Sequence, residues 1–127
     1  AFEHHFDKDV IVHRKGATLA REGVIGIIPG SQGTASYIVE GLGNPESFCS
    51  CSHGAGRVLS RKAAIHTLDM KAEVKNLEAK GIIHAIRCQD DMQEASGAYK
   101  DIEEVIANES DLVKVKTKLL PIAVIKG

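Results

Sequence analysis

The sequence contains 127 residues, of which 43% are hydrophobic and 4% are aromatic. This size and composition suit one aliphatic domain of helices and strands, or part of one. Sixteen basic residues against seventeen acidic ones give a net charge of −1, which excludes a global electrostatic attraction to nucleic acid and leaves only local patches. Three cysteines, with no signal peptide and no apolar run of membrane-spanning length, indicate reduced thiols, a cytoplasmic location and no membrane partner.

The first half of the chain predicts short strands. β-Branched residues gather at 10–12, 24–28 and 37–39, and glycine-rich segments separate these runs. Such runs, interrupted by residues that favour turns, are typical of consecutive strands in a sheet. We therefore expect a β-rich first half with glycine-rich turns.

The pattern changes to helix formers after residue 57. Two stretches, 58–66 and 70–80, contain few strand formers and predict two helices or one broken helix. Gly81 follows the second stretch, and glycine is the residue that most often ends a helix. Helices are thus expected in the middle of the chain.

The last third predicts one more helix between strands. Residues 81–86 read as a strand, and Asp101 followed by Glu104 predicts the start of a short amphipathic helix. Residues 113–119 alternate strictly, with Val113, Val115, Thr117 and Leu119 on one face and the lysines on the other. The apolar run 122–125 comes next, so we expect closing strands at the carboxyl end. The expected fold class is therefore α+β, with the helices after the histidine-containing segment.

One segment carries the clearest chemical signal. Residues 50–57 read Ser-Cys-Ser-His-Gly-Ala-Gly-Arg, so His53 stands at the start of a turn almost free of side chains. Glycine lacks the Cβ that would block a ligand, and exposed backbone N–H groups bind anions. A lone histidine is more often structural, but this one has few packing reasons to be there. The segment predicts a nucleophile or a phosphate cradle.

Other candidate residues have ordinary readings when taken alone. The segment 29–36, Pro-Gly-Ser-Gln-Gly-Thr-Ala-Ser, could be a simple loop after an apolar strand, and Lys126 could be a solvated tail. Cys49, Cys51 and His53 would share a face if extended. Structural zinc sites need four ligands and usually a second cysteine pair, so this spacing predicts no metal site.

Four motifs occur together and in order, at 13–17, 30–37, 52–57 and 126–127. In this combination the chain closely resembles the carboxy-terminal part of the RtcB family, RNA-splicing ligases that use GTP and Mn²⁺. The resemblance implies that residues 1–127 are the carboxy-terminal portion of a single catalytic domain whose amino-terminal portion is absent. It also implies an enzyme that joins RNA 2′,3′-cyclic phosphate or 3′-phosphate ends to 5′-hydroxyl ends, in tRNA splicing or RNA repair.

The resemblance further implies roles for particular residues. His53 would be the catalytic nucleophile that forms a histidine–GMP intermediate, and Tyr99 would stack on the base. The implied GTP- and GMP-binding residues are Pro29, Gly30, Ser31, Gln32, Ser36, His53, Gly54, Ala55, Gly56, Tyr99 and Lys126. Gln32 departs from the family pattern, in which methionine is common. Arg14 and Arg57 are candidates for contacts to RNA phosphates.

The implied cofactors and partners lie partly outside the chain. The resemblance places the manganese ligands upstream of residue 1, so no metal ligand is assigned within the chain, and the isolated 127 residues are expected to be inactive. The expected partner is RNA, either tRNA halves or broken RNA, and an activating protein is a further partner that the family allows. Two alternatives stay open: a non-catalytic GTP- or RNA-binding module, and a paralogue that repairs damaged tRNA or rRNA.

Overall fold

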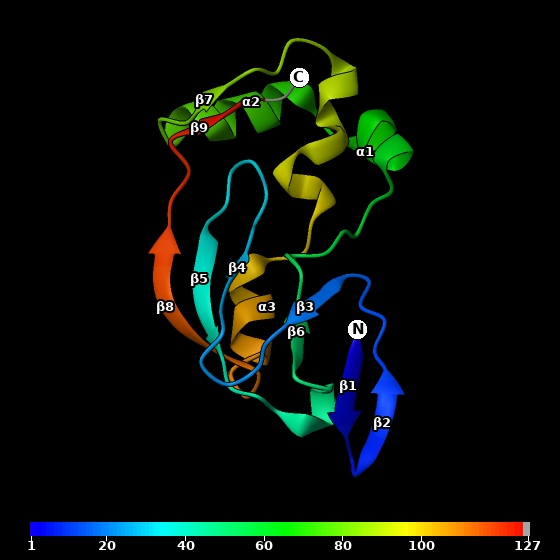
Figure 1. Ribbon diagram of the computed structural model, residues 1–127. Coiled ribbons are helices and arrows are strands. Elements are labelled where there is room, and N and C mark those ends of the chain that lie inside the picture. Colours follow the sequence, from blue (N-terminus) through cyan, green and yellow to red (C-terminus); the bar gives the residue numbers. More distant parts are fainter. Residues whose placement is uncertain (126–127) are drawn as a thin grey trace.

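The computed structural model describes residues 1–125, which form a strand-rich lobe and a helix-rich lobe (Figure 1). The strand lobe contains β1 to β6, α3 and β8, and the helical lobe contains α1, α2, β7, η2, η3 and β9. The elements, with η for 3₁₀ helices, are β1 (Phe2–His5), β2 (Lys8–Ile11), β3 (Ala17–Leu19), β4 (Ile25–Ile28), β5 (Ser36–Gly41), η1 (Pro45–Ser47), β6 (Ser50–Ser52), α1 (Arg61–Thr67), α2 (Met70–Ala79), β7 (Ile83–His84), η2 (Gln89–Glu94), η3 (Ser96–Ala98), α3 (Ile102–Asn108), β8 (Val113–Leu119) and β9 (Ala123–Val124).

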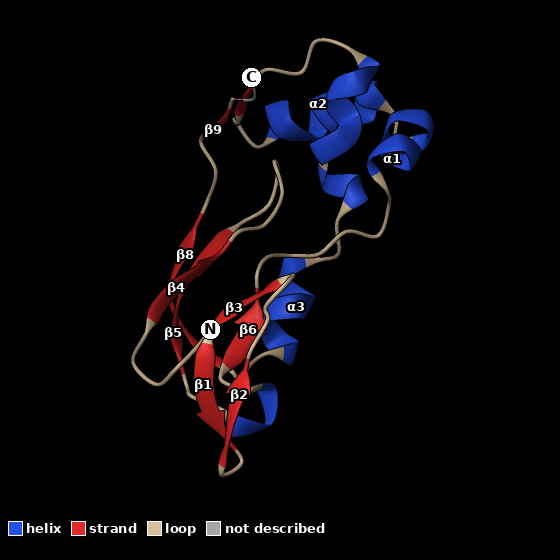
Figure 2. Ribbon diagram, turned by 45° about the vertical axis from the view of Figure 1, so that its right-hand side comes forward, coloured by secondary structure: helices blue, strands red, loops and turns tan. Residues whose placement is uncertain are grey.

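The strands form four small sheets, which Figure 2 shows in red. Antiparallel pairing joins β1 to β2, β3 to β6, and β4 to β5 to β8, while β7 and β9 pair in parallel. Buried residues from β4, β5, β6, α3 and β8 meet in one core cluster, which includes Ile28, Val39, Cys51, Ile102 and Val113. Strands and helices are thus mixed without a barrel, and the predicted α+β class is confirmed.

The alternation predicted for residues 113–119 is broken by a β-bulge. The register against β5 shifts between Ile38 and Val39, so that Lys116 is an extra residue. Beyond it, Lys118 lies opposite Tyr37, near the Tyr37 ring and 2.5 Å from the Glu103 carboxylate of α3. The prediction that every lysine faces away from the valines was therefore wrong at Lys118, because the bulge shifts the alternation by one residue.

The other face of the β4–β5–β8 sheet exposes large apolar side chains beside the ion pair of Glu40 and Lys116. Ile25 is 59% exposed, Ile27 is 56% exposed and Leu119 is 39% exposed among the described residues. Alternation along β4 turns these isoleucines away from Ile28, which is completely buried in the core. An exposed cluster of large apolar side chains is typical of a surface that another polypeptide covers.

The helical lobe follows the sequence pattern closely. α1 begins after Ser60, whose hydroxyl accepts a hydrogen bond from Ala63 N, and α2 begins after Asp69, which caps Lys71 N and Ala72 N. Gly81, at a φ of 70°, follows the end of α2 as predicted. α1 starts later than expected because the N–H groups of residues 58 and 59 donate to Ala98 O instead of entering the helix.

This lobe has a core of its own. One buried cluster joins α2, η2 and the segments beside them, and its members are Leu77, Ile82, Ile86, Met92 and Ala95. Only Ile83–His84 of the predicted strand 81–86 is extended and paired. Within residues 1–125, every helix is too short or too polar to span a bilayer.

A buried ion network anchors the amino-terminal hairpin. The Glu3 carboxylate, whose side chain is 2% exposed, accepts hydrogen bonds from Arg14 Nη1 at 2.5 Å and Nη2 at 2.8 Å. His5 Nε2 lies 2.7 Å from Glu3 Oε2, so both inward side chains of β1 are polar. Phe2, in contrast, is 87% exposed. This inversion of the usual pattern explains why hydrophobic periodicity does not predict β1.

Glu3 should make the fold sensitive to acid. The Arg14 hydrogen bond, together with that of His5, lowers the pKa of Glu3 from 4.5 to about 2. Because this pKa is lower in the folded state than in the unfolded state, the contribution of Glu3 to stability is present above pH 4.5 and is lost as the pH falls towards 2. We expect Glu3→Gln to flatten the dependence of Tm on pH in that window, and thermal unfolding followed by circular dichroism measures it.

The matched control is Glu22→Gln, which changes an exposed glutamate. It should leave the pH dependence of Tm as it is in the unaltered chain. An equally steep dependence in Glu3→Gln would show that the acid sensitivity has another source.

Candidate functional site

Residues from distant segments line a cavity of about 320 Å³ beside His53. The lining consists of Gly16, Pro29, Gly30, Ser52, His53, Gly54, Ala55, Gly56, Arg57 and Tyr99. We call this space the histidine cavity. It brings together eight of the residues selected from the sequence, from the loop after β4, the loop after β6 and the segment before α3. Gly16 and Ser52 also line the cavity. They belong to the motifs at 13–17 and 52–57, but they were not predicted from the sequence as site residues.

The end of β6 fixes the backbone at His53. Ser52 pairs with Ala17 of β3, and His53 N donates to Gly16 O at 3.1 Å. The Ser52 hydroxyl donates to Gly54 O at 2.6 Å, which tightens the turn that follows. His53 itself is exposed. The histidine is therefore held at a strand end with its side chain accessible.

The glycines of the two loops serve the packing of the chain as well as access. A Cβ on Gly54 would lie 3.2 Å from Pro29 O, and Ala55 N donates to the same oxygen at 3.2 Å. Gly56 has a φ of 77°, a backbone conformation that residues with a side chain rarely adopt. These contacts draw the 29–36 loop against the turn that carries His53.

The 29–36 loop uses its own hydroxyls to hold its shape. Ser36 Oγ accepts from Gly30 N at 3.2 Å, and Thr34 Oγ1 accepts from Ser31 N at 2.7 Å. The N–H groups of Gly30 and Ser31 therefore already have hydroxyl partners inside the loop. A bound anion would have to share these N–H donors with the hydroxyls or displace the hydroxyls. Ser31 and Ser36 do not line the histidine cavity.

Gly30 should tolerate no side chain. A Cβ there would lie 2.1 Å from Ala35 O and 2.5 Å from Thr34 Oγ1, so the loop backbone would have to move. We expect Gly30→Ala to lower the free energy of unfolding by about 1–3 kcal/mol, the usual cost of forced overpacking. Denaturant unfolding measures this change.

The control for this substitution is Gly26→Ala, in the strand that leads to the loop. Its Cβ would meet only Val39 Cγ2, at 3.9 Å. It should change stability by less than about 1 kcal/mol. Equal effects of the two substitutions would contradict a special role for the tight 29–36 loop.

Arg57 and Tyr99 form one wall of the histidine cavity. Arg57 Nη1 donates to the Tyr99 hydroxyl at 3.0 Å, and its guanidinium carbon lies 4.9 Å from the centre of the Tyr99 ring. Arg57 also donates to Leu59 O and Gln93 O. Burial raises the pKa of Tyr99, as does its hydrogen bond to Glu94. The tyrosine is therefore a neutral ring held in place at its hydroxyl.

Arg14 lies elsewhere. Its guanidinium donates to Glu3, to Ser50 Oγ at 2.8 Å and to Phe48 O at 2.9 Å. These contacts tie the hairpin to Phe48 and to the first residue of β6, and Arg14 does not line the histidine cavity. The geometry favours a structural role over a contact with RNA phosphate.

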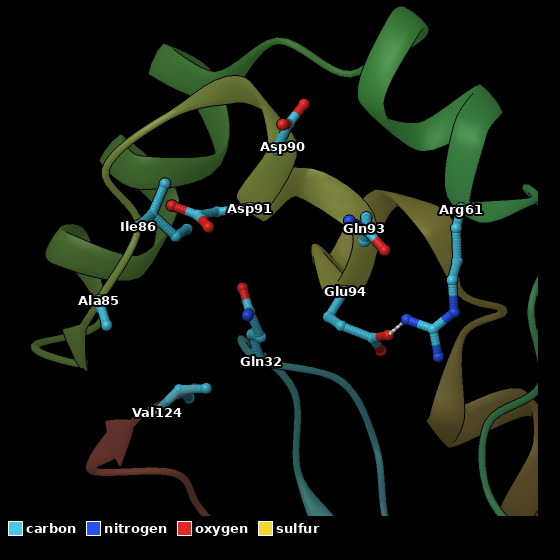
Figure 3. Close-up of a pocket in the computed structure, with 9 residues that line it drawn as sticks. All are labelled: Gln32, Arg61, Ala85, Ile86, Asp90, Asp91, Gln93, Glu94 and Val124. Atoms are coloured by element: carbon cyan, nitrogen blue, oxygen red, sulfur yellow. Dashed lines mark hydrogen bonds and ion pairs between the residues drawn. The ribbon is translucent and has the colours of Figure 1, made fainter. Parts of the chain in front are cut away.

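A second, smaller cavity of about 180 Å³ lies in the helical lobe (Figure 3). Gln32 points into it from the tip of the 29–36 loop, towards Asp91, and Val124 also lines it. Gln32 Oε1 is buried and has no hydrogen-bond partner among the described residues. Gln32 is thus separate from the histidine cavity. Lys126 lies outside the described residues.

The described residues offer no evident metal site. Within residues 1–125, no group of three or more histidine, cysteine, aspartate or glutamate side chains is placed to hold a metal ion. Cys51 is buried, and burial raises the pKa of its thiol to about 11. Cys49 precedes β6 with a φ of 49° and so is not part of the same strand.

An accessible histidine in a glycine-bounded cavity is chemically suited to covalent transfer of a phosphoryl or nucleotidyl group. The profile of the family described as tRNA-splicing ligase RtcB matches residues 1–127. The chain therefore belongs to the RtcB family, as its motifs indicate.

Individual relatives agree with this assignment. The chain is 46% identical to the RNA-splicing ligase RtcB of Escherichia coli strain K12 over 125 residues, which cover 98% of the chain and 30% of that protein. It is 39% identical to the RNA-splicing ligase RtcB of Mycobacterium tuberculosis, with 94% and 32% covered. For the tRNA-splicing ligase RtcB of Pyrococcus horikoshii the identity is 42%, with 93% and 16% covered. The chain thus spans about a third or less of each relative.

Proposed function

We propose that this chain carries the guanylyl-transfer site of an RNA ligase that joins 2′,3′-cyclic phosphate or 3′-phosphate ends to 5′-hydroxyl ends. The observation that carries the proposal is the histidine cavity, in which His53, Arg57 and Tyr99 meet in a glycine-bounded space. Membership of the RtcB family supports the same activity. The presence of the histidine favours a ligase over a non-catalytic binding module.

The cavity fits part of a nucleotide. Its volume of about 320 Å³ is at the lower end of the range for small-molecule sites. A groove of about 810 Å³ shares Gly16, Ser52, Ala55, Gly56 and Tyr99 with it, and so extends the space on one side. The phosphate and ribose would lie against the glycines, and the base would lie against the Tyr99 ring.

His53 would act as the nucleophile. Its neutral imidazole nitrogen would form a bond to the α-phosphorus of GTP, and pyrophosphate would leave with the electrons of the broken P–O bond. A 2′,3′-cyclic phosphate would first be opened by water to a 3′-phosphate. The guanylyl group would then pass from His53 to an oxygen of that 3′-phosphate as the P–N bond breaks, and attack of the 5′-hydroxyl on the RNA phosphorus would form the phosphodiester and release GMP. GTP is thus a substrate, and the site must be open to RNA after guanylylation.

The residues described here do not fit a manganese site, because none of them form a group of three or more suitable ligands. When bound, Mn²⁺ would neutralise charge on the phosphate oxygens. We assign no step to it within this chain and propose that its ligands come from outside residues 1–127. RNA is the proposed partner, the cytoplasm the proposed location, and any activating protein would act on the complete ligase.

The test is GTP-dependent joining of defined RNA ends. It requires a protein of full family length in which residues 1–127 are those of this chain, here called the family-length protein. With GTP and Mn²⁺, RNA ending in a 2′,3′-cyclic phosphate should be joined to RNA that begins with a 5′-hydroxyl. RNA with a 3′-hydroxyl and a 5′-phosphate is the control and should stay unjoined. Joining without GTP, or no joining at all, would refute the proposal.

A further inference from the structure

Glu109 occupies an unfavourable position for a carboxylate. It is the C-cap residue of α3, where the partial charge of the helix is negative. Burial raises the pKa of Glu109, and the nearby charge of Asp111 raises it further, while the hydrogen bond to Ser52 lowers it. Its Oε2 atom is buried and has no hydrogen-bond partner among the described residues. Residues held in such locally unfavourable environments are expected at functional sites.

One contact of Glu109 reaches the histidine turn. Glu109 Oε1 accepts a hydrogen bond from Ser52 N at 2.5 Å, although the two residues are 57 positions apart. β6 pairs with β3 along one edge, so this carboxylate satisfies an N–H group at the end of β6 beside His53. Ser52 in turn bonds Gly54 O, so the residues on both sides of His53 are fixed.

The backbone that carries Glu109 is itself anchored. Leu112 N donates to Glu109 O at 2.9 Å, and Val113 N donates to it at 3.1 Å, which joins the end of α3 to the start of β8. Val113 is buried in the core of the strand lobe. The carboxylate is therefore held at a set distance from the core, and a shorter side chain could not follow Ser52 without moving the backbone.

We propose that Glu109 is a positioning residue for guanylylation: through Ser52 it sets the direction in which the His53 side chain meets the nucleotide. This inference rests on the proposed function of His53. The role depends on an acceptor oxygen at the correct reach and not on negative charge. A general base or a metal ligand would instead depend on the charge, so substitutions can separate the two cases.

The experiment compares three variants of the family-length protein. Glu109→Gln keeps the reach and an acceptor oxygen but removes the charge, whereas Glu109→Asp keeps the charge and shortens the reach. Glu103→Ala is the control, because it removes a carboxylate from the same helix at a position outside both the histidine cavity and the groove beside it. Single-turnover guanylylation is measured at saturating GTP, the affinity for GTP is measured separately by equilibrium binding, and Tm is recorded for each variant.

We expect Glu109→Asp to slow guanylylation by roughly 10²-fold with little change in GTP affinity, the size of effect that a misplaced reactive group produces. The guanylylation rate of Glu109→Gln should stay within about threefold of the rate of the unaltered protein, which is a small change in the height of the reaction barrier. Glu103→Ala should label normally. The reverse order, with Asp active and Gln inactive, would overturn the proposal, as would equal rates in all variants.

Failure of the proposed function has a different signature. If the unaltered family-length protein is not guanylylated on His53, the proposed function fails before Glu109 is tested. If it is guanylylated normally and Glu109→Asp matches it, only the positioning role fails. A lower rate in Glu109→Asp with a lower GTP affinity and a lower Tm would indicate a general structural role and would also overturn the inference.

Discussion

Replacing His53 with alanine in the family-length protein should abolish covalent transfer of GMP from GTP to the protein. Among residues 1–125, His53 is the one histidine that lines the histidine cavity, so no other imidazole of the described chain is placed to take over. Loss of a nucleophile removes most of the rate enhancement of a covalent enzyme, and we expect a fall of roughly 10³-fold or more. Labelling with radioactive GTP, followed by denaturing electrophoresis, measures the covalent product.

Two controls test whether the loss of labelling is specific to the role of His53 as nucleophile. His66→Ala changes an exposed histidine of α1, which lies outside the histidine cavity, and should label normally. His53→Ala should still join RNA that already carries a guanylate on its 3′-phosphate, because the later step needs no histidine nucleophile. Labelling of His53→Ala at the normal level would contradict the assignment. Failure to join the activated RNA would mean that His53 also has a structural role.

The isolated 127-residue chain should neither bind Mn²⁺ tightly nor become guanylylated. The residues described here lack a group of three or more suitable metal ligands, and a metal-binding site needs several donors in one geometry. Without the metal, the nucleophile meets the full repulsion of the triphosphate. The chain should also bind an apolar dye at the exposed face that carries Ile25, Ile27 and Leu119.

Calorimetric titration with Mn²⁺, GTP labelling and dye fluorescence on the isolated chain test this prediction. Ile27→Lys is the matched variant for the apolar face and should lower dye fluorescence while leaving Tm nearly unchanged, because Ile27 is 56% exposed. Tight binding of Mn²⁺ together with covalent GMP on His53 would prove the chain self-sufficient and our assignment of the metal ligands wrong.

Local signals in the sequence predicted the elements that depend on local chemistry. α2 begins after Asp69 and is followed by Gly81, since capping residues act within a turn of the helix. β1 gave no such signal, because its inward side chains, Glu3 and His5, are held by distant Arg14 and by each other. The bulge at Lys116 could not be predicted either, because residues 113–119 alternate without interruption and only the pairing with β5 sets the register.

The candidate site divides in the same way. Glycines around His53 mark a tight, accessible turn, so the turn could be expected from the sequence alone. The contact between Glu109 and Ser52 could not, because it joins residues 57 positions apart through the packing of α3 against β6. Gln32 was grouped with Gly30 by its place in a motif, but the loop carries its side chain into the cavity of the helical lobe.

The histidine cavity lies where the chain passes between its two lobes. Arg57 follows the last strand before the helical lobe, Tyr99 precedes the return to α3, and the two residues pair with each other at this crossing (Figure 1). His53 belongs to one lobe, while Gln93, which accepts from Arg57, belongs to the other. Arg57, which lines the cavity, is therefore tied to η2 of the helical lobe. A nucleotide that contacts His53 and Tyr99 together would stabilise this crossing, so that occupancy of the site and the resistance of both lobes to unfolding are linked.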